Sequence, residues 1–437
     1  MPQDNFNIGL AFSGGGFRAA AFHLGTLKKL KELGVLDKVH VLSTISGGSL
    51  AGAFYMLHKN NFDKFTRLLE NALQVSVVKE VLFSKRFLTF TISLLIIWAV
   101  PFCLISPPWA LLSFLVTAII VLIFLYSFIP LSDLVEQAYN KMFFEKKKLS
   151  DFPEKPVIAI NSTNLETGGL FTFSKEYMGD SNYEHNLKGG KPVFFKVLDF
   201  PVSVAVSAST AIPFPFNPIK IKQKHYSNPE DFPKRADPSL VDGGVYDNQG
   251  IHKITNKMSR YKCDTIICSD AAAPFKRKFY QMNPLPILTR MNSIMMLRIK
   301  NLQKSMNVYG KSSGLLKEIA YYSIDWNYED CIDGFIKNLS GGELRENVAK
   351  AHNIPEEYYT NPNDFKEQEI KDFITQKINY KEIIKNGLMA EEINKISGIK
   401  TGLSPLTKDK LDLLSRHASV LTEIQVRLYC PSLFINP

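Results

Sequence analysis

The chain has 437 residues, enough for one large domain or two ordinary ones. Its 52 lysines and arginines exceed its 42 aspartates and glutamates, and the resulting net charge of +10 favours anionic partners. The basic residues are spread out, without an arginine-rich block interleaved with aromatic residues, so we expect no nucleic-acid partner. The five cysteines are odd in number and include no CxxC pair, which argues against a disulfide framework or a zinc site and favours reduced thiols.

The first elements predicted are a strand, a helix and a second strand. The N-terminal MPQDNFNIGL lacks the charged and then apolar pattern of a secretory signal, so we expect the main domain to remain in the cytosol. Short apolar runs at 8–13 and 39–45 end in small residues and predict strands. Between them, residues 17–33 carry apolar side chains at helical spacing, and Gly34 stands where a C-cap glycine belongs.

Three glycines, Gly14, Gly15 and Gly16, join the first predicted strand to the helix. Backbone N–H groups at a helix N-terminus stabilise a phosphate or an oxyanion equally well. A dinucleotide-binding fingerprint would need a third glycine where Ala19 stands, and an acidic residue about 20 positions on. No Asp or Glu ends the next predicted strand, so the fingerprint is only approximate.

The second predicted strand ends in a serine flanked by small residues. The sequence 44–48, TISGG, follows the nucleophile-elbow pattern G-x-S-x-G except that Thr44 replaces the first glycine. The elbow puts Ser46 at the N-terminus of a predicted helix at 47–58, where the helix dipole favours alkoxide character. Gly47 and Gly48 supply the small neighbours that a strained turn needs. Two glycine-rich strand-to-helix turns together predict a nucleophile and an oxyanion hole.

A long apolar stretch follows. No residue from 87 to 132 is charged, and each half is about as long as the roughly 20 residues that cross a bilayer as a helix. Pro107-Pro108 predict the turn between two helices. Lys85-Arg86 before the stretch and the lysines at 146–148 after it place both ends in the cytosol by the positive-inside tendency. We therefore expect a membrane-embedded hairpin, either spanning or re-entrant, rather than a hairpin buried in a soluble core.

The remaining chain predicts more of the same sheet and then helices. Apolar runs at 157–163 and 265–269 are separated from the earlier strands by helical patterns, which indicates a parallel sheet covered on both faces. From residue 275 onward the chain is mostly helical and polar in pattern. There is no internal repeat and no low-complexity linker.

A candidate base follows the serine at a distance. Asp242 ends a short apolar run and precedes two glycines, an arrangement that would otherwise be an ordinary turn. A Ser46–Asp242 dyad needs only that the two side chains lie within hydrogen-bond reach. The alternative is a triad with one of the later histidines, His252, His352 or His417, although none follows a strand in a small-residue context. His23 is interpreted as structural.

The three motifs resemble those of the patatin-like phospholipases. In that family a GGGxR oxyanion loop, a GxSxG serine and a DG[GA] aspartate occur in this order, matching 14–18, 44–48 and 242–244. The segment 205–216, AVSASTAIPFPF, is similar to the family's small-residue helix and proline-rich turn. The resemblance spans roughly residues 8–270, interrupted by the apolar stretch.

The resemblance implies an α/β fold: a three-layer sandwich with a mainly parallel central sheet, into which the transmembrane or monotopic hairpin is inserted. It also implies a serine esterase acting on acyl lipids, with Ser46 as nucleophile and Asp242 as base. Gly14 to Gly16 would donate hydrogen bonds to the oxyanion, and Arg18 would hold their loop or stabilise charge beside it. Thr44 departs from the family pattern but removes no catalytic group, so we expect activity to survive.

The expected organisation has four parts. Residues 1–86 and 133–275 form the catalytic domain, 87–132 the hairpin, and 276–437 a mainly helical region packed on the catalytic domain. The expected partners are a membrane phospholipid or other acyl lipid and the bilayer itself, with the catalytic domain facing the cytoplasm. We expect no cofactor and no metal ion. In particular, the sequence gives no sign of calcium dependence, since no EF-hand type of loop occurs.

Two fragments resemble nucleotide-binding motifs. Leu339 to Glu343 is similar to the signature of ABC-type ATPases, and Gly310-Lys311-Ser312 ends like a P-loop. Position 305 is serine where a P-loop needs glycine, so we do not expect ATP hydrolysis. Residues 340–342 are better explained as a helix start, with Glu343 in the first turn.

Two classes of function remain open. One is a membrane-bound lipid acyl hydrolase of the phospholipase A type. The other is a non-catalytic protein that retains the fold to bind lipid or a partner at the membrane. The intact serine and aspartate favour the hydrolase.

Overall fold

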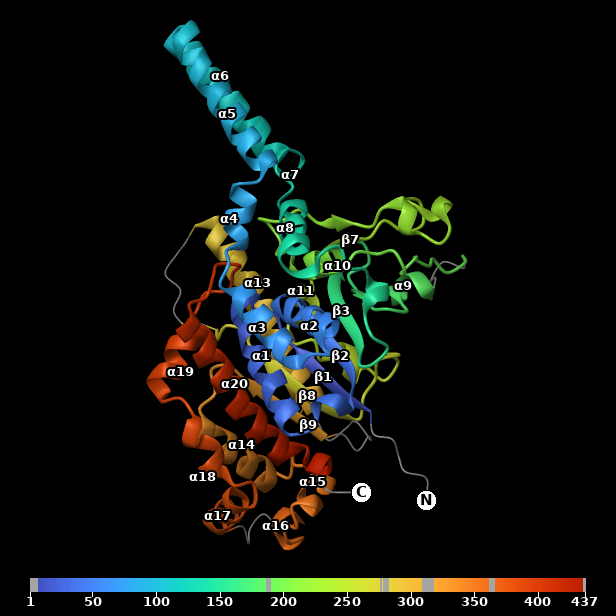
Figure 1. Ribbon diagram of the computed structural model, residues 1–437, viewed down its shortest axis with the longest axis vertical. Helices are drawn as coiled ribbons and strands as arrows, with labels where there is room; N and C mark the ends of the chain where they lie inside the picture. The colour runs from blue at the N-terminus through green and yellow to red at the C-terminus, as the bar shows by residue number, and fades with distance from the viewer. Residues whose placement is uncertain are drawn as a thin grey trace.

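A nine-stranded sheet runs through the body of the protein (Figure 1). The computed structural model describes residues 7–185, 190–275, 277, 283–308, 318–360 and 366–434. The main strand order is β5-β4-β3-β2-β1-β8-β9, and β7 pairs with both β3 and β6. The strands are β1 (Ile8–Phe12), β2 (Val39–Ile45), β3 (Val157–Asn164), β4 (Leu170–Phe173), β5 (Met178–Asp180), β6 (Ile219–Lys220), β7 (Ser239–Asp242), β8 (Thr265–Asp270) and β9 (Glu318–Ser323).

The centre of the sheet is parallel. β1 pairs in parallel with β2 and β8, while β2–β3 and β8–β9 extend the parallel part on either side. The pairs β3–β4, β3–β7, β4–β5 and β6–β7 are antiparallel. All four strands expected from apolar runs are present, so the predicted α/β class with a mainly parallel sheet is confirmed.

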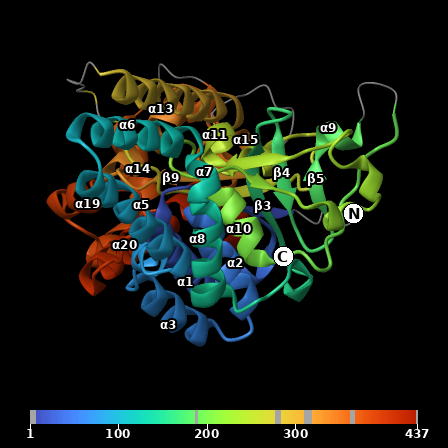
Figure 2. The same ribbon diagram turned by 90° about the horizontal axis from the view of Figure 1, so that it is seen from above.

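Helices cover both faces of the sheet, and from above α13 lies on one side of it with α1 and α2 on the other (Figure 2). The α-helices are α1 (Gly16–Glu32), α2 (Gly47–His58), α3 (Phe62–Leu73), α4 (Val77–Leu82), α5 (Lys85–Leu104), α6 (Pro107–Ile123), α7 (Leu125–Phe128), α8 (Leu131–Tyr139), α9 (Ser181–Glu184), α10 (Val202–Thr210), α11 (Gly244–Asp247), α12 (His252–Thr255), α13 (Pro284–Gln303), α14 (Tyr328–Ser340), α15 (Glu346–Ala351), α16 (Glu357–Thr360), α17 (Glu367–Lys377), α18 (Tyr380–Ile383), α19 (Ala390–Ser397) and α20 (Lys408–Tyr429).

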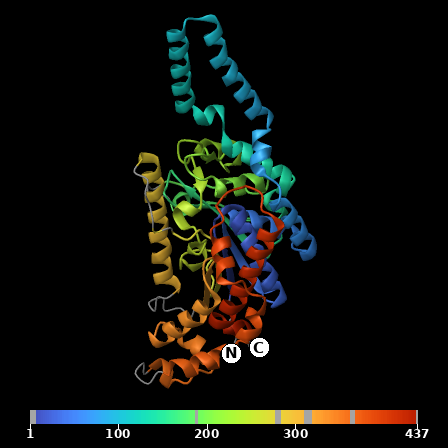
Figure 3. The ribbon, with the colours of Figure 1, turned by 90° about the vertical axis from the view of Figure 1, so that its left-hand side faces the viewer.

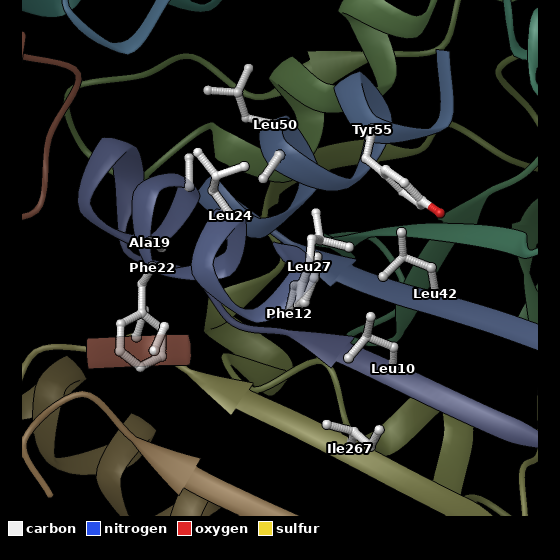
Figure 4. Packing of buried hydrophobic residues seen from close by; sticks show 14 of the residues in the cluster. Leu10, Phe12, Ala19, Phe22, Leu24, Leu27, Leu42, Leu50, Tyr55 and Ile267 are labelled. Carbon is white, nitrogen blue, oxygen red and sulfur yellow. The ribbon is translucent and has the colours of Figure 1, made fainter. Parts of the chain in front are cut away.

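The side-chain alternation of β1 divides the core into two. Leu10 and Phe12 point into the larger core, where they lie beside Leu27 of α1 (Figure 4). Ala11, between them, belongs to a smaller core on the opposite face, formed with residues of α12 and of the chain leading into β8. Because both faces are covered by apolar side chains, the strands are continuous apolar runs rather than alternating ones.

The C-terminal helix α20 packs along α1. The two helices approach so closely at Gly25 that a Cβ atom there would lie 2.0 Å from the Ser415 carbonyl oxygen. The N-terminal and C-terminal parts of the chain therefore share one core.

Two long apolar helices, α5 and α6, contact each other and project from the body (Figures 1 and 3). At their base, Arg86 Nη2 donates to the Ser127 carbonyl oxygen over 3.4 Å. No residue of α5 is buried, and by length and composition α5 could cross a membrane. α6 passes the same test only together with Leu125–Phe144, from which it is bent by 80°. The expected proline turn is displaced, because Pro107 begins α6 and the break lies just before it.

Two details of the C-terminal region differ from expectation. β9 lies within the region expected to be mainly helical and extends the sheet beside β8. Ser340 ends α14 instead of starting a helix, because Gly342 adopts a left-handed φ of 63° just after the Gly341 C-cap. The P-loop-like residues 310–312 lie outside the described residues.

Candidate active site

Ser46 occupies a strained turn between β2 and α2. Its φ of 49° and ψ of −120° lie outside the regions that residues with side chains normally adopt. The following residue must be small, since a Cβ atom on Gly47 would lie 2.2 Å from the Gly16 carbonyl oxygen. Likewise a Cβ atom on Gly48 would lie 2.6 Å from the Phe12 carbonyl oxygen. The serine turn and the glycine loop are therefore in direct backbone contact.

Asp242 reaches Ser46 from the antiparallel strand β7. Because β7 pairs with β3, it delivers Asp242 to the edge of the sheet at which β2 ends. The Ser46 hydroxyl lies close enough to the Asp242 carboxylate to favour its ionised form, and the Gly244 amide donates to Asp242 Oδ1 over 2.7 Å. Burial raises the pKa of Asp242 to about 6, although these two donors oppose the rise.

The glycine loop offers two backbone amides rather than three. The Gly14 amide already donates to the Asn248 carbonyl oxygen over 2.9 Å, so the expectation that Gly14 donates to an oxyanion does not hold in this arrangement. Gly15, with a φ of 145°, and Gly16, with a φ of 62°, adopt conformations that favour glycine. Within the described chain their amides have no acceptor, which leaves them available beside Ser46.

Arg18 is buried beneath the loop. Its Nε and Nη2 atoms donate to the Ala271 carbonyl oxygen over 3.1 and 2.8 Å, and Nη1 donates to the Ile399 carbonyl oxygen over 2.6 Å. Burial lowers the pKa of Arg18 to about 10, so the guanidinium stays charged at neutral pH. Arg18 was expected either to hold the glycine loop in shape or to stabilise charge beside it. These hydrogen bonds match the first role.

No described histidine lines the cavity at Ser46. His417 lies between the Tyr328 hydroxyl and the Ile324 carbonyl oxygen, and His352 bonds to the Leu428 carbonyl oxygen. His252 packs against a tyrosine ring outside the cavity. None of these three histidines is therefore placed to form a triad with Ser46 and Asp242, the alternative that the sequence left open.

His23 is part of the buried support of the glycine loop. Its Nε2 lies 2.9 Å from the Ser13 carbonyl oxygen and its Nδ1 3.0 Å from the Ser269 hydroxyl. A carbonyl can only accept, so Nε2 carries the proton and Nδ1 accepts from the serine. Burial lowers the pKa of His23 to about 4, which keeps it neutral.

A cavity of about 580 Å³ opens at Ser46 and Asp242. One wall comes from α13, through side chains that the sequence did not point to: Arg290, Asn292, Ser293, Met296, Leu297 and Lys300. Lys300 Nζ lies 2.7 Å from Asp270 Oδ2, a fully buried carboxylate at the end of β8. Burial alone would raise the pKa of Asp270, but Lys300 and the Tyr321 hydroxyl hold it at about 2.

The cavity also extends toward the base of the apolar hairpin. Ile212 and Pro213 line it, and the next residue, Phe214, accepts a hydrogen bond of 2.7 Å from the Tyr126 hydroxyl of α7. Only Asp270 among the missed residues carried a sequence signal, since it directly follows a predicted strand, at the edge where Ser46 and the glycine loop lie. Within the described residues, no three His, Cys, Asp or Glu side chains form a group that could hold a metal ion.

Fold and site define an α/β protein with a serine and an aspartate close together beside a glycine-rich helix N-terminus. Residues 10–253 match the patatin-like phospholipase family, and the chain belongs to that family. None of the curated proteins compared with the chain matches it.

Several solved structures match parts of the chain at low identity. Human GIVD cytosolic phospholipase A2 is 13% identical with a TM-score of 0.43, and the match covers 98% of this chain and 63% of that one. In complex with methyl gamma-linolenyl fluorophosphonate it matches at 21% identity and a TM-score of 0.29, covering 42% of this chain and 25% of that one. VipD from Legionella pneumophila is 12% identical with a TM-score of 0.33, over 99% and 93% of the two chains. The chain thus spans between 25% and 63% of the length of these human phospholipase chains.

Proposed function

We propose that the protein is a membrane-associated serine hydrolase that cleaves acyl esters of lipids. The observation that carries the proposal is the closeness of the Ser46 hydroxyl to the Asp242 carboxylate, beside the unoccupied amides of Gly15 and Gly16. Membership of the patatin-like phospholipase family supports a lipid ester as substrate. The expected activity is of the phospholipase A or lysophospholipase type.

The chemistry follows from these groups. Asp242 takes the proton of the Ser46 hydroxyl as its oxygen attacks the ester carbonyl, and the amides of Gly15 and Gly16 stabilise the oxyanion. Protonated Asp242 then gives the proton to the leaving alcohol, which leaves an acyl-Ser46 enzyme. Water, activated by the same carboxylate, releases the fatty acid and restores the serine. With its pKa at about 6, Asp242 is ionised at neutral pH yet basic enough to accept a proton. These steps require no cofactor or metal ion.

The hairpin supports a site at the membrane. α5 and α6 expose apolar side chains along their length, and Tyr126 connects their base to the segment that lines the cavity. Basic residues flank the hairpin on both sides, which by the positive-inside tendency leaves the catalytic domain in the cytoplasm. An anchored hydrolase of this shape would keep its cavity close to the lipid headgroups.

The test is release of fatty acid from phospholipid vesicles by purified wild type, Ser46→Ala and Asp242→Asn. We expect release by wild type only, with both variants at least about a thousandfold slower because each removes a group that acts in every step. Circular dichroism and thermal unfolding establish that the three proteins fold alike. If wild type, like both variants, hydrolyses neither lipids nor simple esters, the alternative of a non-catalytic lipid-binding protein is favoured.

A further inference from the structure

A turn of the C-terminal region lies directly on the glycine loop. The Phe17 amide donates to the Gly402 carbonyl oxygen over 2.9 Å. The two backbones are so close that a Cβ atom on Gly16 would lie 2.3 Å from the same carbonyl oxygen. The turn, residues 399–402, is called the C-terminal clamp below. It lies outside the residues that match the family.

The clamp holds the loop at a second point through Arg18. The guanidinium bridges the Ala271 carbonyl oxygen, just after β8, and the Ile399 carbonyl oxygen of the clamp. Three segments far apart in the sequence are therefore joined by one buried cation. A lysine could reach either carbonyl, but it lacks the planar fork that reaches both.

The clamp is itself fixed on both sides. At its start, the amide of Ile399 donates to the Ile396 carbonyl oxygen in the last turn of α19. After it, the Leu406 amide donates to the Leu73 carbonyl oxygen of α3 over 3.0 Å. α20 then follows and packs along α1. The clamp thus links the C-terminal helices to the first turn of α1 and fixes where that turn lies relative to them.

The first N–H groups of a helix have no partner within the helix, and their directions decide what they can bind. Here Asn248 takes the Gly14 amide and the clamp takes the Phe17 amide. The two amides left between them are those of Gly15 and Gly16. We infer that the C-terminal clamp is a positioning element that orients the Gly15 and Gly16 amides toward the oxyanion formed at Ser46. The inference rests on the proposed function, because it assigns the clamp to that reaction.

The experiment lengthens the chain just after the clamp. A Gly-Gly insertion between Gly402 and Leu403 loosens the connection to α20 without changing any side chain. A small soluble ester, 4-nitrophenyl butyrate, reports on the chemistry independently of membrane binding. We expect kcat to fall about a hundredfold while KM stays within about twofold, because a small misplacement of oxyanion donors affects the transition state and not the bound substrate. The rate at which a fluorophosphonate inactivates Ser46 should fall in parallel.

The matched control is the same insertion after Gly342, in the turn between α14 and α15, which contributes no residue to the cavity at Ser46. It should leave kcat and KM unchanged. If the insertion after Gly402 also leaves kcat unchanged in a folded protein, the clamp does not position the loop and the inference is overturned. If wild type hydrolyses neither esters nor lipids, the proposed function itself fails and the inference falls with it.

Arg18→Lys provides a second variant should the insertion prevent folding. It keeps the charge but loses the bridge, so we expect kcat to fall at least about tenfold while KM changes little. The kcat of Arg18→Met should be lower still, because this variant loses the charge as well. A lysine variant with the kcat of wild type would contradict the inference, since the bridge to the clamp would then be dispensable.

Discussion

Asp242 illustrates at the scale of one residue how a general base is tuned by burial. The carboxylate is 7% exposed, and desolvation outweighs the two donors that favour its ionised form. A base with a pKa of about 6 is better matched to neutral pH than a solvated carboxylate with a pKa of about 4. The same rise costs stability, because an ionised group is then better solvated in the unfolded chain.

We predict that Asp242→Asn stabilises the protein at neutral pH. The folded pKa of about 6 lies above the unfolded value of about 3.9, so the wild type loses stability as the pH rises from about 4 to 6 and stays at the lower level above that. The asparagine variant avoids this loss, which amounts to about 2 to 3 kcal/mol for two pKa units. Thermal unfolding in detergent at pH 4, 5, 6 and 7 should show a gap that widens up to pH 6. Asp372→Asn, at an exposed position, is the control. A gap that is constant over this range would contradict the explanation.

The β2–α2 elbow shows at the scale of an element how Thr44 replaces the family's glycine. Its methyl group lies against α2 at Gly52, where a Cβ atom would lie 2.6 Å from Thr44 Cγ2. Its hydroxyl accepts a hydrogen bond of 3.0 Å from Ser49. The methyl group of Thr44 is therefore accommodated because Gly52, in α2, has no side chain, and the serine turn keeps its conformation.

We predict a strong coupling between positions 44 and 52. Gly52→Ala should destabilise the wild type by about 1 to 3 kcal/mol, because the new methyl group overlaps Thr44 in a packed interior. In a Thr44→Ser background the hydroxyl remains but the methyl is gone, so the same change should be neutral or stabilising by up to about 1 kcal/mol, the preference of a helix for alanine. Denaturant unfolding of the four proteins measures the coupling. Equal effects of Gly52→Ala in both backgrounds would show that the two side chains do not compete for this space.

At the scale of the whole molecule, the hairpin is set apart from the α/β body (Figure 3). Its helices make few contacts with the core, and their base is narrow because Arg86 and Ser127 are hydrogen-bonded to each other. The body has its own core, in which α1 and α20 join the two ends of the chain. Removal of the hairpin should therefore leave the fold intact.

We predict that replacing residues 87–125 with a flexible linker of about four residues separates membrane binding from chemistry, since such a linker spans the narrow base. Fractionation of cells without detergent should move the protein from the membrane to the soluble fraction. Hydrolysis of 4-nitrophenyl butyrate should remain within about threefold of wild type, while release of fatty acid from vesicles should fall at least about tenfold as the local concentration of lipid is lost. Wild type found wholly in the soluble fraction would sink the membrane proposal, and loss of both activities would show that the hairpin supports the fold.

Much of the fold and the centre of the site could be read from the sequence because their signals are local. A buried parallel strand is a short apolar run, and a strained turn needs glycine or another small residue beside it. The residues around Gly14, Ser46 and Asp242 each show this pattern without reference to the rest of the chain. Since parallel strands end at one edge of a sheet, the topology brings the Gly14 and Ser46 turns together, and the antiparallel strand β7 brings Asp242 to the same edge.

The tertiary structure alone decided which groups at that edge are available. The acceptor of the Gly14 amide is the carbonyl of Asn248, and that of the Phe17 amide is the carbonyl of Gly402. Any residue type supplies a backbone carbonyl, so no side-chain pattern marks these partners. β9, the α13 wall and the C-terminal clamp were missed because their places depend on packing between separate segments of the chain and not on a local pattern. The sequence by itself determined the chemistry of the turns, and the fold determined which amides of the glycine loop keep no acceptor among the described residues.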